Sequence, residues 1–335
     1  KIVEAQEAKT HFDISTFPLF NIRILESCED KNLLVINIHH IIADAYSINI
    51  ILEKIQEYYK LLKGNENIEK NKDDINYIDY LIWQNEELEK GKYDDELNYW
   101  KDKLKGNLNI IDLSEKNITF GSFKGNVRKV NIDEDVIKRF KEICKDNGMT
   151  LFAGFTTVLY MFINYLTYES DISIGCGVSG RGRSEIEKTI GNFAGALLLR
   201  CNIDENKGFS SIAKDVKKTV DEAYRYQSLP YEKVIKEINL DRQYFTLPYK
   251  ILIDYIENED KGKDGIFSSF NYSKLIAPAD FCLFIQSNNG VHNLSFTYKE
   301  ELFSDYEMAE FELLFKNIIN EIVKNPEKKF VCYDL

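Results

Sequence analysis

Hydrophobic residues recur along the chain with two different periods, which together predict a mixture of helices and strands. Apolar residues three and four positions apart indicate amphipathic helices, whereas short runs rich in β-branched and aromatic residues, bounded by polar turns, indicate strands. The predicted strands are 17–25, 33–38, 127–132, 171–178, 193–203, 249–256, 281–286 and 294–298. The predicted helices are 48–62, 133–146, 150–165, 209–226, 231–238 and 305–323, with a further helix-rich stretch between 75 and 105.

The order of these elements predicts an α+β protein with two lobes. Strands and helices do not follow the regular βαβ order of a doubly wound parallel sheet. Residues 17–25 and 33–38 are expected to pair as antiparallel strands, and Asn288-Asn289-Gly290 predicts a hairpin between the last two strands. Residues 107–123 have only short apolar pairs, a glycine at Gly121 and no sustained period, so we expect a linker there, with domains at 1–120 and 121–335.

Two adjacent histidines, His39 and His40, follow the strand predicted at 33–38. We expect the strand to end on these histidines, so alternation places His40 on the same face as Ile38 and Ile36, and His39 on the face of Asn37 and Val35. One imidazole is therefore expected to point into an apolar interior, where its tautomer would be fixed.

Composition excludes several classes of function. The formal net charge is −12 and the pI is about 5.1, whereas nucleic-acid binding requires a cationic surface. The six cysteines form no CxxC pair and have no histidine cluster near them, so we expect no zinc site and a reducing, cytoplasmic compartment. No apolar run is long enough to span a bilayer, and no signal-peptide pattern is present.

His40 is the strongest candidate for a catalytic group, because a neutral imidazole can accept a proton near pH 7. A buried structural histidine is the alternative from the residues alone. Asp44 and Ser47 invite a triad with His40, but Ser47 stands at a helix start, where serine usually caps backbone N–H groups, and the chain has no G-x-S-x-G elbow. A metal site at His39, His40 and Asp44 lacks further ligands.

A glycine-rich turn, Gly175 to Arg183, has the composition of a phosphate-binding loop. It lacks both the Lys-Ser/Thr ending of a P-loop and the GxGxxG spacing, so we do not expect a nucleotide site. Glycines within a strand are instead typical of backbone that passes close to a ligand.

Several motifs resemble those of condensation domains of nonribosomal peptide synthetases. The segment His39–Ser47 (HHIIADAYS) resembles the family's HHxxxDG signature. Further similarities follow in the family's order: Tyr77–Trp83 to YxDYAxW, Gly148–Phe152 and Ser179–Arg181 to parts of the second lobe, Ile190–Arg200 to IGxFVNTxxxR, Tyr226–Glu232 to HQDxPFE, and Leu247–Pro248 to a late Pro-Leu motif.

The resemblance implies two chloramphenicol-acetyltransferase-like lobes, each a mixed sheet packed with helices, arranged as a V with a central tunnel. The chain starts at Lys1, and the family's first two motifs have no counterpart before Phe17. We therefore expect residues 1–120 to be the remainder of the N-terminal lobe, and the 335 residues by themselves to be a poor catalyst.

The resemblance also implies an activity and its partners. The family joins a donor acyl or peptidyl thioester to the amine of an acceptor aminoacyl thioester. Both substrates are carried on the phosphopantetheine of upstream and downstream carrier domains, with an adenylation domain in the same synthetase and no cofactor bound by the domain itself. A monomeric piece of a module is expected, without nucleic-acid or membrane partners.

By the same resemblance, His40 is the active-site residue, with His39, Asp44 and Ala45 as its supporting motif. Additional tunnel or motif positions are Ser47, Gly191, Asn192, Gly195, Arg200 and Gln227.

Three features of this sequence depart from the family. The family's aspartate pairs with an arginine of the missing N-terminal motif, so Asp44 is expected to lack its partner. Ala45 replaces a glycine, which would cost roughly 1 kcal/mol if the position needed a positive φ. Gly195 replaces an asparagine.

Other members of the fold give alternative functions. Epimerization domains also have the two histidines, but residues 190–200 follow the condensation pattern. Heterocyclizing members, which have aspartates in place of the histidines, are excluded. An ester-forming relative and a non-catalytic domain that recruits carrier domains or tailoring enzymes remain as alternatives; retention of His39 and His40 argues against the latter.

Overall fold

A computed structural model describes residues 12–26, 32–68, 75–106, 108–116, 124–237, 249–258, 277–288 and 290–335. The chain forms two compact units. Unit 1 comprises Lys1–Lys92, Ser179–Gly195 and Lys261–Leu275, and unit 2 comprises Tyr93–Val178, Ala196–Asp260 and Ile276–Leu335. The stretch Ser179–Gly195 belongs to unit 1, although the residues on either side of it in the sequence belong to unit 2. We call Ser179–Gly195 the crossover segment.

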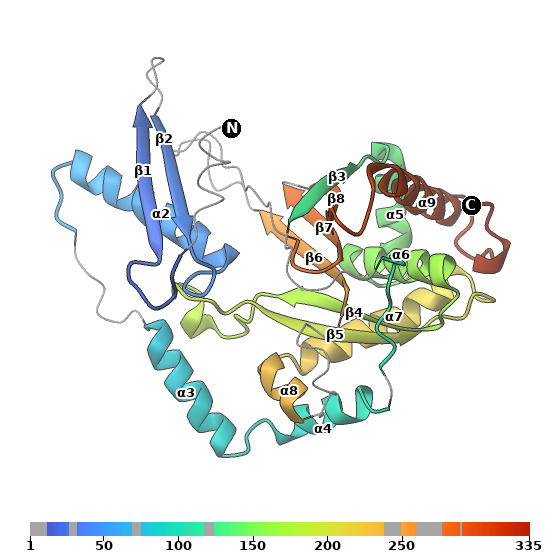
Figure 1. Ribbon diagram of the computed structural model, residues 1–335, viewed down its shortest axis with the longest axis horizontal. Coiled ribbons are helices and arrows are strands. Elements are labelled where there is room, and N and C mark those ends of the chain that lie inside the picture. Colours follow the sequence, from blue (N-terminus) through green and yellow to red (C-terminus); the bar gives the residue numbers. More distant parts are fainter. Residues whose placement is uncertain are drawn as a thin grey trace. The chain divides into compact units, whose positions relative to one another are not determined.

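In the described part of unit 1 lie an antiparallel pair of strands and helices α2 and α3 (Figure 1). Strand β1 (Phe20–Glu26) pairs with β2 (Asn32–Ile38) in a register that aligns Phe20 with Ile38, which confirms the predicted pairing. Helix α2 spans Ala45–Lys63 and α3 spans Tyr77–Glu89. Gly64 is the C-cap of α2, and Asn65 follows with a φ of 57°.

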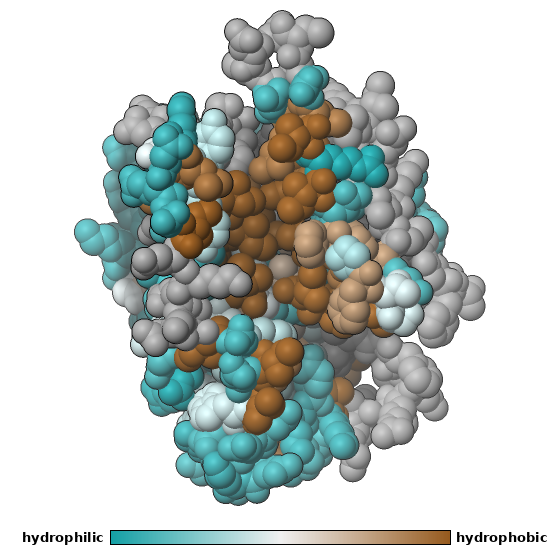
Figure 2. Space-filling model, turned by 90° about the vertical axis from the view of Figure 1, so that its left-hand side faces the viewer, coloured by the Kyte–Doolittle hydropathy of each residue, from teal (hydrophilic) through white to brown (hydrophobic). Residues whose placement is uncertain are grey.

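Alternation holds along these two strands as far as Ile38. The register places Phe20, Ile22 and Ile24 opposite Ile38, Ile36 and Leu34, so one face of the pair is apolar throughout. Phe20, Ile22 and Ile24 of β1 are exposed to solvent. Figure 2 shows that hydrophobic side chains gather on the face of the molecule that it draws. The hydrophobic period therefore determined the strand pairing.

Unit 2 is built on a six-stranded mixed sheet, as predicted for an α+β protein. The strand order is β3-β8-β7-β6-β4-β5. Strand β6 runs parallel to β4 and β7, whereas β8 runs antiparallel to β7 and β3. The strands span Gly125–Val130 (β3), Asp171–Val178 (β4), Gly195–Asn202 (β5), Ile251–Asn258 (β6), Phe281–Asn288 (β7) and Val291–Lys299 (β8).

Helix α6 forms the centre of the core of unit 2. Its Phe162 ring packs against Phe281 of β7 and Phe296 of β8, with ring centroids 6.0 and 6.2 Å apart, and against Phe311 and Phe315. The described residues of this unit include the helices α4 (Asp94–Lys103), α5 (Glu134–Asp146), α6 (Leu151–Thr167), α7 (Phe209–Arg225), α8 (Tyr231–Glu237) and α9 (Asp305–Lys324). Short 3₁₀ turns lie at Ser184–Ile186 in the crossover segment and at Phe330–Cys332.

Among the described residues, no single helix has both the length and the apolarity to cross a bilayer. Helices α5 and α6 pass such a test only when taken together, and they are bent by 103° relative to each other. Of the five cysteines that the structure describes, Cys144, Cys176, Cys201 and Cys282 are buried and Cys332 is exposed.

Candidate functional site

The two histidines lie just beyond β2, in a turn that leads to α2. Strand β2 ends at Ile38, and the N–H groups of Ile42 and Ala43 donate to the carbonyl oxygens of His39 and His40, at 3.1 and 3.3 Å. The alternation of side chains therefore ends at Ile38, and it does not decide the direction of His39 or His40. A turn, rather than a strand, sets the direction of both side chains.

His40 is exposed, which corrects the expectation that it points into an apolar interior. His39 is the more constrained of the two. It is half-buried, its Nδ1 accepts the N–H of Ile41 at 3.1 Å, and its ring meets the edge of Phe12. Because Nδ1 is an acceptor, neutral His39 carries its proton on Nε2. His39 is held in place by the turn, whereas the His40 side chain is accessible.

Asp44 connects this turn to α2 and to the crossover segment. Its carboxylate caps the helix, accepting the N–H of Ser47 at 2.7 Å. The same carboxylate accepts the N–H of Phe193 at 3.0 Å, and the N–H of Asp44 donates to the Gly191 carbonyl oxygen at 3.2 Å. Asp44 is only 3% exposed, so its charge requires these partners.

Arg181 is the charged partner of Asp44, which corrects the expectation that Asp44 lacks one. Arg181 Nη2 lies 3.1 and 3.3 Å from the two carboxylate oxygens, and the side chains are 3% and 2% exposed. The other amino group, Nη1, donates to the carbonyl oxygens of Ile186 and Thr189 at 2.9 and 2.8 Å. The guanidinium also stacks on the Phe193 ring, 4.2 Å from its centroid. In the sequence, Arg181 resembles only a part of the family's second lobe, and nothing there marks it as the partner of Asp44.

Ser47 is fully buried and has a structural function. Its hydroxyl donates to the Gly191 carbonyl oxygen at 2.7 Å and accepts from the Gly191 N–H at 3.0 Å and from Arg181 Nη2 at 2.9 Å. Ser47 is thus no nucleophile, as the sequence predicted. The interpretation of Ser47 as a helix cap was wrong, because Asp44 is the N-cap of α2.

The crossover segment can approach Asp44 because of Gly180. Gly180 has a φ of +65°, and a Cβ there would lie 1.9 Å from the Phe193 carbonyl oxygen. A side chain at this position would separate the two ends of the segment, and with them Arg181 and Phe193, from Asp44. Gly180 is therefore required by the backbone geometry.

Ala45 is the first residue of α2, and its backbone is not strained. Among the described residues other than glycine, only Asn65 and Tyr168 have a positive φ. The replacement of the family's glycine by alanine consequently has no conformational cost.

We predict that Ala45→Gly lowers the free energy of unfolding by up to about 1 kcal/mol, since glycine loses more backbone entropy than alanine in a helix. Denaturant titration of the two proteins measures the difference. A clear stabilisation by glycine would show instead that the alanine is strained.

The remaining candidate residues fall in both units. Gly191 and Asn192 lie beside Asp44 and Ser47 in unit 1, and Gly195 is an exposed residue at the start of β5. Arg200 belongs to unit 2, where it pairs with Asp171 at 2.6 Å and donates to the Lys105 carbonyl oxygen. Gln227 follows α7 in unit 2 and is half-buried. The structure thus assembles His39, His40, Asp44, Ala45, Ser47, Gly191 and Asn192 in one unit.

The described residues contain no cluster that could hold a metal ion, and two of their buried thiols have raised pKa values. No group of three or more histidine, cysteine, aspartate or glutamate side chains in the described ranges could hold a metal ion. Burial raises the pKa of the Cys144 and Cys176 thiols to about 12, so both stay protonated near neutral pH. The late Pro-Leu motif, Leu247–Pro248, lies outside the described residues.

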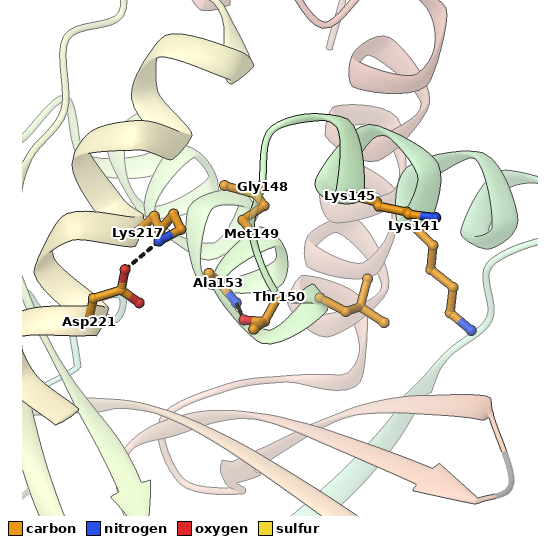
Figure 3. Close-up of a pocket in the computed structure, with 9 residues that line it drawn as sticks. Lys141, Lys145, Gly148, Met149, Thr150, Ala153, Lys217 and Asp221 are labelled. Atoms are coloured by element: carbon orange, nitrogen blue, oxygen red, sulfur yellow. Dashed lines mark hydrogen bonds and ion pairs between the residues drawn. The ribbon is translucent and has the colours of Figure 1, made fainter. Parts of the chain in front are cut away.

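A surface pocket in unit 2 has none of the candidate residues in its lining (Figure 3). It encloses about 370 Å³ between α5, the start of α6 and α7, and Lys141, Lys145, Lys217 and Asp221 are among its lining residues. Lys217 and Asp221 form an ion pair along α7, on one side of the pocket. The candidate site is therefore defined by the turn in unit 1.

Comparison with known proteins places these motifs in a family. The family model for the condensation domain matches residues 1–335. A linear gramicidin synthase of Brevibacillus parabrevis is 26% identical over 99% of this chain, which spans only 7% of that protein's length. Gramicidin S synthase 2 of Aneurinibacillus migulanus is 25% identical over 95% of this chain, which again spans 7% of its length. These curated relatives are thus much longer than this chain.

Two solved structures have the same fold at low sequence identity. The X-domain from teicoplanin biosynthesis superposes with a TM-score of 0.88 and 16% identity, covering 99% of this chain and 79% of that chain. The condensation domain from Monacolin K polyketide synthase MokA superposes with a TM-score of 0.81 and 18% identity, covering 97% of this chain and 77% of that chain. The predicted fold class, an α+β chloramphenicol-acetyltransferase-like fold, is confirmed.

Proposed function

This chain belongs to the condensation-domain family, and from that premise we propose that it forms an amide bond between two carrier-bound thioesters. The acceptor amine would attack the carbonyl carbon of the donor thioester. A C–N bond forms, the C–S bond breaks, and the donor's phosphopantetheine leaves as a thiol. Condensation domains are acyltransferases of this kind in nonribosomal peptide synthetases.

The accessible imidazole of His40, next to a buried and fully bonded Asp44, is the observation that carries this proposal. His40 would accept a proton from the acceptor nitrogen as the C–N bond forms and pass it to the leaving thiolate. Asp44 would not share this proton, because its carboxylate is already bonded to Arg181, Ser47 and Phe193. It would instead hold the turn in position.

His39 would support the turn, since its Nδ1 already accepts the Ile41 N–H. Gly191, Asn192 and Ser47 would maintain the backbone around Asp44. Arg200 and Gln227 would contribute only through unit 2, where Arg200 is bonded to Asp171.

The substrates would be carried by an upstream donor and a downstream acceptor carrier domain, on their phosphopantetheine arms. An adenylation domain of the same synthetase would load the acceptor. We propose a cytoplasmic, monomeric module piece that binds no cofactor of its own and no nucleic acid. A lobe boundary near residue 120, inferred from the sequence, belongs to this proposal.

The test uses the full-length protein with separately loaded donor and acceptor carrier domains. Mass spectrometry of the acceptor phosphopantetheine arm should reveal an added donor acyl group that depends on the acceptor's α-amine. Product only with a hydroxy-acyl acceptor would indicate an ester-forming enzyme, and exchange of the α-hydrogen with solvent deuterium would indicate epimerization. Carrier binding without any product would contradict the proposal and favour a recruitment domain.

A further inference from the structure

The aromatic residues at the start of α3 have no place in the reaction described above, although the sequence marks them as a motif. Tyr77, Tyr80 and Trp83 lie at positions i, i+3 and i+6, so they share one side of the helix. The rings of Tyr77 and Tyr80 lie 4.9 and 5.0 Å from the ring of Phe193, which belongs to the crossover segment. Helix α3 therefore packs directly on the segment that supplies the partners of Asp44.

Tyr77 makes the most specific of these contacts. Its hydroxyl donates to the Asn192 carbonyl oxygen at 2.5 Å. Its ring covers Gly191 so closely that a Cβ on Gly191 would lie 2.4 Å from Tyr77 Cδ2. Tyr77 thus contacts both residues of the Gly191–Asn192 dipeptide, one through its ring and one through its hydroxyl.

Gly191 of the same dipeptide also bonds to the residues that follow the turn containing His39 and His40. The Gly191 carbonyl oxygen accepts the Asp44 N–H at 3.2 Å and the Ser47 hydroxyl at 2.7 Å. Asp44 is joined by one peptide bond to Ala43, whose N–H donates to the His40 carbonyl oxygen. The Tyr77 side chain is therefore linked to the backbone of His40 through the Gly191–Asn192 dipeptide and then through Asp44 and Ala43.

A second contact supports the same arrangement. The Thr189 hydroxyl donates to the carbonyl oxygen of Ile75, two residues before Tyr77, at 3.0 Å. The Thr189 carbonyl oxygen accepts from Arg181 Nη1 at 2.8 Å. The start of α3 is thus connected to the crossover segment on both sides of Gly191, and through it to the buried Asp44–Arg181 pair.

We propose that Tyr77 is a positioning residue: by clamping Gly191–Asn192 against the start of α2, it sets the direction of the His40 side chain. The inference rests on the proposed function for its effect on catalysis, but the effect on the His40 side chain is independent of it. Tyr77 contacts neither the substrate nor the reacting atoms in this scheme. It acts through the backbone of the crossover segment.

The test is Tyr77→Phe, which keeps the ring and removes the bond to Asn192. The expected result is a fall in kcat of about 3- to 10-fold, the value of one hydrogen bond, with unchanged KM for both loaded carriers. The imidazole NMR resonances of His40, assigned by their loss in His40→Gln, should shift, while the circular dichroism spectrum stays the same.

Tyr80→Phe is the matched control, because the Tyr80 hydroxyl accepts from Gln84 within the same helix. It should leave kcat and the His40 resonances unchanged. Gly191→Ala, which pushes the Tyr77 ring away from the dipeptide, should reproduce the shift seen in Tyr77→Phe.

Unshifted His40 resonances in both Tyr77→Phe and Gly191→Ala would overturn the inference. A wild-type protein that makes no amide, yet whose His40 resonances shift in Tyr77→Phe, would contradict only the proposed function and would support the positioning role.

Discussion

His40→Ala is expected to lower the rate of amide formation by at least about 100-fold, the lower end of what a positioned acid–base group contributes. The loss should appear in kcat, because alanine removes the proton acceptor without altering the bonds that fix the turn. Those bonds use the backbone of His40 and the side chain of Asp44. Single-turnover measurements with both carriers loaded would give the rate directly.

His39→Asn is the matched control for this experiment. Asparagine offers a side-chain oxygen that can accept the Ile41 N–H in place of His39 Nδ1. The rate should then fall much less than in His40→Ala, with carrier binding unchanged in both variants. Equal losses at the two positions, or a His40→Ala protein that retains most of its rate, would contradict the assignment of His40 as the proton acceptor.

Arg181→Met is expected to destabilise the protein by about 3–5 kcal/mol, the usual cost of removing one partner of a buried ion pair. The variant removes Arg181, the cation paired with the Asp44 carboxylate, and Asp44 is only 3% exposed in the native protein. It also removes the donors to Ile186, Thr189 and Ser47. Denaturant unfolding followed by far-UV circular dichroism measures the change.

Arg139→Met is the control, because Arg139 pairs with Glu142 where both side chains are about half exposed. Such a surface pair contributes at most about 1 kcal/mol. Asp44→Asn combined with Arg181→Met should cost less than the sum of the two single changes, because the uncompensated charge is then absent. A loss below about 1 kcal/mol in Arg181→Met would show that the pair is not buried in solution.

The hydrophobic period predicted nearly every element of this fold. Strand 171–178 matches β4, and helix 305–323 matches α9 within one residue. These elements bury one face or all faces against a core, so the pattern of apolar residues records their structure directly. The antiparallel pairing of β7 with β8 also followed from local chemistry, because Gly290 between them adopts a φ of +82°.

The direction of the histidines did not follow from the same pattern. Alternation applies only while the backbone stays extended, and β2 ends at Ile38 because the chain then turns toward α2. That turn depends on bonds to Leu19 and Gly191, which lie outside the segment. Local periodicity carries no information about such bonds.

The sequence by itself determined the two kinds of secondary structure, the pairing of β1 with β2 and the motif that contains His40. Only the tertiary structure decided how Asp44 is held. Its partner Arg181 lies 137 residues further along the chain, and the peptide unit that binds Ser47 lies 144 residues away. A buried carboxylate needs a partner, but this requirement does not identify which distant cation will pair with it. The path of the crossover segment, which is part of unit 1, determines that the partner is Arg181.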